Sequence, residues 1–178
     1  MMGMREASYW SSYFLADGVV MGFFLSLLIT VLSSIMGLYH NLGAGYNDDD
    51  SYPDFFGLFL LLFLSTLAMT TMAFAISACF DTPQTAAMCA FACMIAGVVV
   101  FALFLFTPSI KRALFDGASQ ELLWCLFPPT ALQVGLLAGG FTMEGGLFAY
   151  FTADVKLSSV YLMLLLDAAV LSFLSWYL

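Results

Sequence analysis

Charged residues, and basic residues above all, are what this sequence lacks. Only 9% of its 178 residues are charged, with four Lys and Arg against twelve Asp and Glu. Soluble domains carry about 25% charged residues, so this chain has too little polar surface to cover a soluble core. The net charge of −8 also excludes nucleic acid as a partner, because binding a phosphate backbone needs clustered Lys and Arg.

The sequence also lacks a nucleotide-binding motif and a set of metal ligands. Its two lysines, Lys111 and Lys156, follow Ile110 and Val155, so no P-loop ending in Gly-Lys-Ser/Thr is present. All four cysteines lie in apolar runs, without a His or third Cys near enough to complete a tetrahedral site. We therefore expect a chain that is not an enzyme by itself and that holds no metal or cofactor.

What the sequence has in abundance is long hydrophobic runs. Hydrophobic residues make up 63% of the chain, including nineteen Phe. About 20 apolar residues suffice for a helix to cross the hydrocarbon layer of a membrane. The fold class predicted is an all-α polytopic membrane protein, a single domain over residues 1–178 that is integral to a membrane and multi-pass. Four spans are predicted, at about residues 10–38, 55–80, 84–106 and 157–178.

A fifth apolar run, at about residues 120–141, carries the signals of a broken helix. Pro128 and Pro129 interrupt it, and Gly135 and Gly139 follow at a spacing of four. Broken backbone at membrane depth is tolerated only where it packs against protein or lines a wet cavity. We therefore predict a re-entrant helical hairpin here, with the two glycines as a face for close helix packing.

Two short patterns predict how the spans pack. The turn after the second span contains Asp81, Thr82 and Pro83, in which Thr82 can cap the third span and Pro83 can occupy its first helical position. So short a connection predicts neighbouring antiparallel helices. Gly18 and Gly22 form a second small-residue face, in the first span.

Two acids lie within predicted spans and are candidates for polar contacts inside the membrane. Asp167 lies near the middle of the last span, where an acidic residue costs about 2.5–3.5 kcal/mol on insertion scales. It either lines a translocation path or locks its helix to a neighbour, or it makes a structural hydrogen bond to Ser, Thr or Tyr on another helix. Asp17 lies roughly 10 Å along its helix from Trp10, within reach of the interface or of neighbouring polar groups.

Five segments, in order along the chain, resemble the membrane domain of the A subfamily of ABC (ATP-binding cassette) transporters. They are Met1-Met2-Gly3-Met4-Arg5 before Tyr9-Trp10, the turn Phe80-Asp81-Thr82-Pro83, residues 126–135 (LFPPTALQVG), residues 144–146 (EGG), and the last span with LLLD at 164–167 and SWYL at 175–178. The resemblance extends over nearly the whole chain and implies part of an ABC-2 type transporter membrane domain.

This resemblance implies that the chain works together with other parts of a transporter, which the sequence does not include. In the family, six helices move lipid or another amphipathic molecule by alternating access, driven by ATP and Mg²⁺ at separate nucleotide-binding domains. The partners implied are membrane lipids, a nucleotide-binding domain and the remaining transmembrane helices, so the chain is expected to be a fragment. Contacts with the ATPase domain are implied for Met2, Gly3, Arg5, Asp81, Thr82 and Pro83.

Two alternatives remain open, as does the orientation. The chain could instead belong to an ABC-2 type exporter of drugs or glycans, or it could be a non-transporting four-span membrane scaffold. The resemblance places both termini in the cytoplasm. The positive-inside rule favours the opposite side, because that topology leaves one base inside and three outside. The sequence indicates neither the substrate nor which membrane holds the chain.

Overall fold

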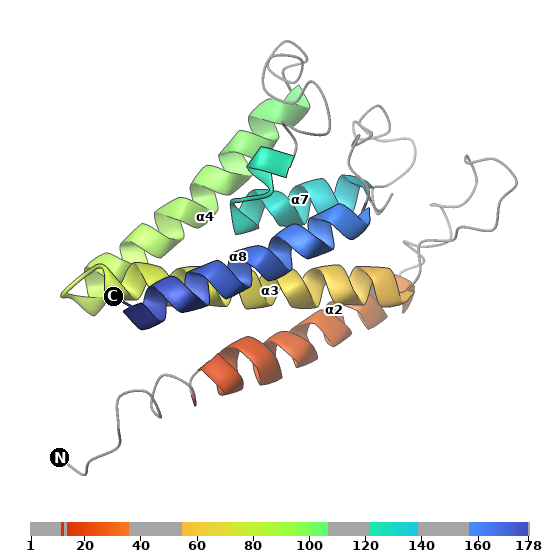
Figure 1. Ribbon diagram of the computed structural model, residues 1–178. Helices are drawn as coiled ribbons and strands as arrows, with labels where there is room; N and C mark the ends of the chain where they lie inside the picture. Colours follow the sequence, from red (N-terminus) through yellow and green to blue (C-terminus); the bar gives the residue numbers. More distant parts are fainter. Residues whose placement is uncertain (1–11, 13, 36–54, 107–121, 139–156, 178) are drawn as a thin grey trace, which may run out of the picture.

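Helices account for nearly all of the structure described here. The computed structural model describes residues 12, 14–35, 55–106, 122–138 and 157–177, and this part of the chain contains no strand. A π-helix, η1, continues directly into α2, and four further helices follow (Figure 1). Their bounds are η1 Phe14–Met21, α2 Gly22–Ile35, α3 Phe55–Ala78, α4 Pro83–Phe106, α7 Pro128–Ala138 and α8 Leu157–Tyr177.

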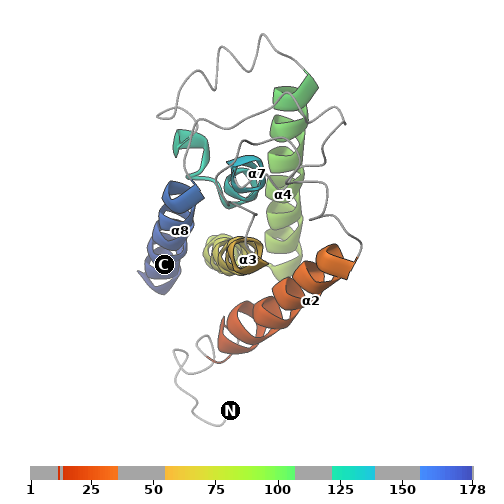
Figure 2. The same cartoon turned by 90° about the vertical axis from the view of Figure 1, so that its right-hand side faces the viewer.

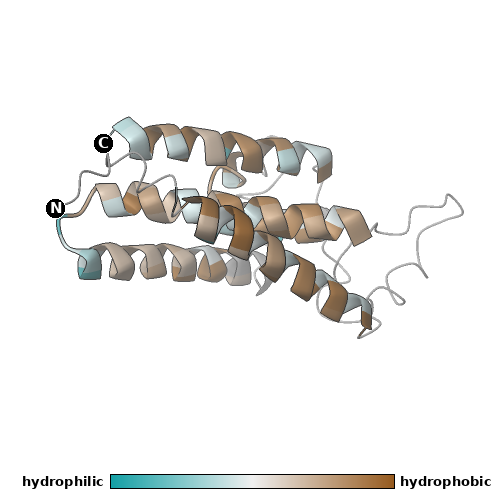
Figure 3. Cartoon of the chain, turned by 90° about the horizontal axis from the view of Figure 1, so that it is seen from below, coloured by the Kyte–Doolittle hydropathy of each residue, from teal (hydrophilic) through white to brown (hydrophobic). Residues whose placement is uncertain are grey.

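Four helices in the described part are long and apolar enough to cross a membrane. They are Phe14–Ile35, Phe55–Ala78, Pro83–Val100 and Leu157–Tyr177. Hydrophobic residues line these helices, whereas hydrophilic colour marks the amino end of α4 (Figure 3). The four predicted spans are therefore confirmed as helices, and the chain is an all-α integral membrane protein of the multi-pass class. The π-helical start of the first span was not predicted.

Helix α3 is the centre of the bundle. Seen end-on, it is surrounded by α8, α7, α4 and α2 (Figure 2). It contacts each of them, most extensively α8. Its buried residues recur at spacings of three and four and so form one broad face of the helix: Leu58, Leu61, Leu64, Ser65, Ala68, Thr71, Met72 and Ala75. A helix that is apolar all round and carries no charge suits this position, because every face meets protein or lipid.

The turn from α3 to α4 follows the predicted pattern. Helix α4 begins at Pro83, and the backbone N–H of Ala86 donates to the carbonyl of Thr82 over 3.1 Å, as in a first helical turn. The side-chain hydroxyls of Thr82 and Thr85 also contact each other. The two helices are neighbours at this turn and then diverge, and α7 lies between their far halves (Figure 1).

The fifth apolar run is broken just before its two prolines. A helical turn at residues 122–124 ends, and α7 starts at Pro128. Proline fits the first turn of a helix because its missing N–H has no partner there anyway. With 11 residues, α7 is about 16 Å long and too short to cross a bilayer. The re-entrant hairpin stays a prediction, because residues 107–121 and 139–156 lie outside the described part.

Helix ends gather at two ends of the bundle. The start of η1, the turn between α3 and α4 and the end of α8 lie at one end (Figure 1). The end of α2, the start of α3, the end of α4 and the start of α8 lie at the other. The spans thus alternate in direction along the chain, as successive crossings of one membrane do.

Candidate functional site

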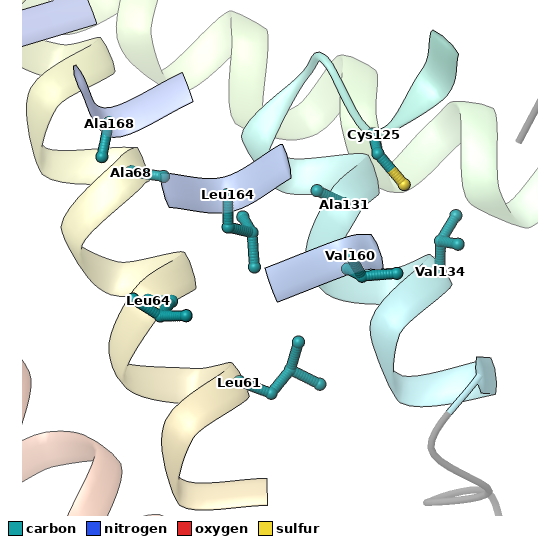
Figure 4. Close-up of a cluster of buried hydrophobic side chains, with 9 residues drawn as sticks. All are labelled: Leu61, Leu64, Ala68, Cys125, Ala131, Val134, Val160, Leu164 and Ala168. Atoms are coloured by element: carbon teal, nitrogen blue, oxygen red, sulfur yellow. The ribbon is translucent and has the colours of Figure 1, made fainter. Parts of the chain in front are cut away.

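The packed core lies where α3, α7 and α8 meet. Nine buried residues form it: Leu61, Leu64, Ala68, Cys125, Ala131, Val134, Val160, Leu164 and Ala168 (Figure 4). Next to it, the Tyr161 hydroxyl on α8 donates to the Gly57 carbonyl on α3 over 2.8 Å. Since both residues lie near the starts of their helices, α3 and α8 run parallel and in a fixed register.

Gly135 lets α7 approach this core closely. A Cβ atom at this position would lie 2.5 Å from Leu61 Cδ1 and 3.2 Å from Val160 Cγ1. Leu61 and Val160 are both fully buried, so neither side chain has room to move aside. Gly135 therefore lies at a helix–helix contact, in the position that its predicted packing role requires. Gly139, its predicted companion, lies outside the described residues.

A second close approach joins α4 to α7 and was missed in the sequence. A Cβ atom on Gly97 would lie 2.6 Å from Pro129 Cβ and 3.4 Å from Phe127 Cε1. Pro128 and Pro129 are buried at the start of α7, so the proline pair that breaks the helix also provides the surface against which α4 packs. Gly97 was not singled out because its partner lies some 30 residues away, on an element whose position only the fold determines.

The first span packs on α3 through a stripe of small residues. Gly18 lies against Thr70, with its virtual Cβ 3.4 Å from Thr70 Cγ2, and Gly22 lies against Thr66 at 3.1 Å. Ser26 and Thr30 continue the stripe at the same spacing of four, and all four stripe residues are buried. The sequence analysis found only the two glycines. Extending the same spacing to Ser and Thr would have found the other two.

Hydroxyl groups along α2 and α3 are satisfied within their own helices. Ser26 Oγ donates to the Gly22 carbonyl over 2.8 Å, and Thr30 Oγ1 donates to Ser26 over 2.7 Å. On α3, Ser65 Oγ donates to Leu62 over 2.9 Å, and Thr71 Oγ1 donates to Ala68 over 2.8 Å. Such back-bonding removes the hydroxyl hydrogen from contacts with other helices but leaves oxygen lone pairs available.

Phenylalanine rings extend the contact between α2 and α3 beyond this stripe. The ring of Phe23 meets Phe59 edge-to-face at a centroid distance of 5.4 Å and Phe63 at 6.2 Å. Phe59 and Phe63 stack on each other at 6.1 Å. Phe23 is 44% exposed, so part of this aromatic cluster faces outward to lipid. Aromatic pairs of this geometry contribute about 0.5–1.5 kcal/mol beyond their buried area.

Asp167 is the most unusual side chain in the described bundle. It lies on α8 with only 3% of its surface exposed, beside the fully buried Leu164. Its Oδ2 atom has no hydrogen-bond partner among the described residues. The only other buried side-chain atom there without a partner is Oε1 of Gln133, on α7. Asp167 thus faces the bundle interior, and the polar contact predicted for it stays a prediction, because Oδ2 has no partner among the described residues.

Asp17, the second predicted intramembrane acid, lies in a different environment. It falls in the first turn of η1, next to the buried Gly18, but its own side chain is exposed on the outside of the described bundle. This first-turn position is close to the amino end of that helix. A carboxylate near a helix amino terminus is stabilised by the helix dipole.

The residues expected to contact an ATPase domain are only partly within the described chain. Asp81, Thr82 and Pro83 are all exposed, at the turn that projects from one end of the bundle. They are thus accessible to a partner on that side of the membrane. The three others expected to make this contact, Met2, Gly3 and Arg5, lie outside the described residues.

No metal-binding arrangement is present in the part of the chain that the structure describes. A search of those residues finds no group of three or more His, Cys, Asp or Glu side chains. The four cysteines form no disulfide, and only Cys125 is fully buried. The notable features of the described residues are thus their packing surfaces and one buried acid, Asp167.

Comparison with known proteins gives one relevant match. No protein-family model matches the chain, and no solved structure matches it. It is similar to "ABC transporter A family member 9" of Arabidopsis thaliana, with 28% identity over 140 residues. The match covers 76% of this chain and 13% of that relative, so the chain spans only a small part of the relative's length. The four apolar helices thus belong to a chain that is similar to a small part of this relative.

Proposed function

We propose that this chain is part of the membrane domain of an A-subfamily ABC transporter. In this proposal it moves lipid or another amphipathic molecule across a membrane by alternating access. The observation that carries the proposal is the similarity over 140 residues to an Arabidopsis protein named as an ABC transporter. The four apolar helices and the exposed turn at one end of the bundle support it.

ATP hydrolysis takes place elsewhere in this proposal. The sequence holds no P-loop, so ATP and Mg²⁺ bind at a nucleotide-binding domain that is a separate part of the transporter. Movement of that domain reaches the membrane through the exposed turn at Asp81, Thr82 and Pro83. Because a short capped turn between rigid helices deforms little, a displacement of that domain at the turn displaces the two helices as well.

Helices outside this chain complete the membrane domain. Helix α4 is the least buried of the four spans: 11% of its most apolar 18-residue stretch is buried in the bundle, against 39% for α3. In the proposal, lipid and the remaining transmembrane helices cover the exposed faces of α4, α2 and α8. A transported lipid then meets surfaces rich in Phe and Met, which adapt to acyl chains of varied shape.

The first experiment is to sequence the transcript that encodes the chain in both directions. An open reading frame that continues into a domain with a P-loop is expected. A transcript that ends on both sides without such a domain, in a cell where no separate subunit copurifies with the chain, would reject the proposal.

A second experiment tests the coupling turn in the whole transporter in nanodiscs. Asp81→Lys reverses an exposed charge at the turn and is expected to lower substrate-stimulated ATPase activity while leaving the protein folded. Met88→Leu is the control, since Met88 is 66% exposed on α4, the helix into which this turn leads. Equal ATPase stimulation in the two variants would contradict a coupling role for the turn.

A further inference from the structure

Asp167 has no cationic partner on the helices that surround it. Its helix, α8, packs against α3 and α7. Between Phe55 and Ala78, and between Pro128 and Ala138, the sequence contains no Asp, Glu, Lys, Arg or His. The other titratable groups nearby in the bundle are Cys125, in the core cluster, and Tyr161, whose hydroxyl donates to the Gly57 carbonyl. Nothing there neutralises a carboxylate.

No donor on the described parts of these helices bonds Oδ2 of Asp167. The one side-chain amide on them, that of Gln133 on α7, does not donate to this atom. The buried hydroxyls of α3, Ser65 and Thr71, give their hydrogens to carbonyls of their own helix. Thr130 on α7 does the same toward the carbonyl of Phe127. Backbone N–H groups inside a helix are already bonded to the preceding turn. This explains why Oδ2 of Asp167 has no partner among the described residues.

Acceptors, by contrast, are plentiful. A hydroxyl oxygen that donates its hydrogen still has lone pairs, and each backbone carbonyl can accept a second hydrogen bond. A protonated carboxyl group is itself a donor and needs only an acceptor, whereas a carboxylate can only accept. The surroundings of Asp167 therefore suit the acid form and not the anion, because an unpaired buried charge is far more costly than a neutral acid.

We propose that Asp167 binds a proton at neutral pH and, as a neutral acid, hydrogen-bonds α8 to the rest of the bundle. Loss of this proton leaves a buried anion between α8 and its neighbours, which loosens their packing. The ligand of the site is thus a proton. The inference rests on burial and hydrogen bonding alone and does not depend on the proposed transport function.

Infrared spectroscopy of the full chain in nanodiscs, with ¹³C-labelled aspartate, reports the protonation state directly. A protonated carboxyl group gives a C=O band separate from the carboxylate bands, and we expect one such band at neutral pH. Asp167→Asn should remove it, because Asn is isosteric and cannot ionise. Asp17→Asn is the matched control and should leave the band unchanged, since Asp17 is exposed on the surface of the bundle.

Thermal melting of the same samples gives a second readout, and its wild-type measurement stands even if a variant fails to fold. The folded chain holds a proton that an unfolded aspartate has lost at neutral pH, so stability must fall as pH rises through the loss of the acid band. Wild type and Asp17→Asn should share this fall, and Asp167→Asn should lack it. Absence of any acid band in wild type at neutral pH would overturn the proposal. So would a melting midpoint that does not change while the band disappears.

Discussion

Alanine at Gly97 is expected to destabilise the bundle because its new methyl group meets a rigid ring. The added Cβ would lie 2.6 Å from Pro129 Cβ, well inside van der Waals contact. A flexible side chain could rotate away, but the pyrrolidine ring of Pro129 is fixed to the backbone of α7. Relief therefore requires α4 and α7 to move apart, which also separates Gly97 from Phe127.

The magnitude follows from two opposing terms. Overpacking a close-packed interior costs about 1–3 kcal/mol, and a contact with a rigid ring belongs in the upper half of that range. Replacing Gly by Ala inside a helix returns about 1 kcal/mol. The net loss is about 1–2 kcal/mol of unfolding free energy, or a factor of about 5–30 in the folded-to-unfolded ratio.

The assay is unfolding by SDS in mixed micelles, followed by circular dichroism. Gly18→Ala is the matched control, because its Cβ would lie 3.4 Å from Thr70 Cγ2, an ordinary contact distance. It should be as stable as wild type or more so. Pro129→Gly provides a further check: it removes the opposing Cβ, so Gly97→Ala should destabilise that background less than wild type. If Gly97→Ala proves as stable as Gly18→Ala, the close approach of α4 and α7 is not as described.

Three further predictions concern the core and the ends of the bundle. Leu164→Ala, at a fully buried position on α8, should lower the unfolding free energy by about 2 kcal/mol or more. Leu162→Ala, at a position 63% exposed on the same helix, should change it little. Equal losses in SDS unfolding would contradict the described core. Tyr161→Phe should lose about 0.5–1.5 kcal/mol in the same assay, because the hydrogen bond to α3 disappears, and an unchanged midpoint would argue against that bond. In oriented vesicles, a membrane-impermeant maleimide should label Cys79 from one side only, because Cys79 is exposed at the α3–α4 turn. It should leave the buried Cys125 unmodified. Labelling of Cys79 from both sides, or any labelling of Cys125, would refute the arrangement.

Some of this architecture could be predicted from local sequence. Long apolar runs give spans because a bilayer requires about 20 apolar residues in a self-bonded backbone, and that requirement can be checked one segment at a time. The start of α4 was equally local, since Thr82 and Pro83 have the capping and conformational properties of a helix start. The break before α7 was local for the same reason, through Pro128 and Pro129.

Long-range contacts could not be predicted in this way. In a membrane, apolar side chains are as well solvated by lipid tails as by protein, so hydrophobicity does not tell which face of a helix is buried. The sequence therefore marked Asp17 and Asp167 alike as acids within spans, but only the packing distinguishes them. It leaves Asp17 exposed and encloses Asp167 between α8 and its neighbours.

By itself, the sequence determined that this is an all-α membrane protein with four spans, because composition and run length decide whether a segment prefers lipid. The tertiary structure alone decided that α3 is central, that Gly97 packs against Pro129, and that Asp167 is buried against two helices, α3 and α7, that carry no charge. These features depend on which helices meet. That in turn depends on close approach between small residues and rigid rings distant in sequence, a property of pairs of surfaces rather than of any single segment.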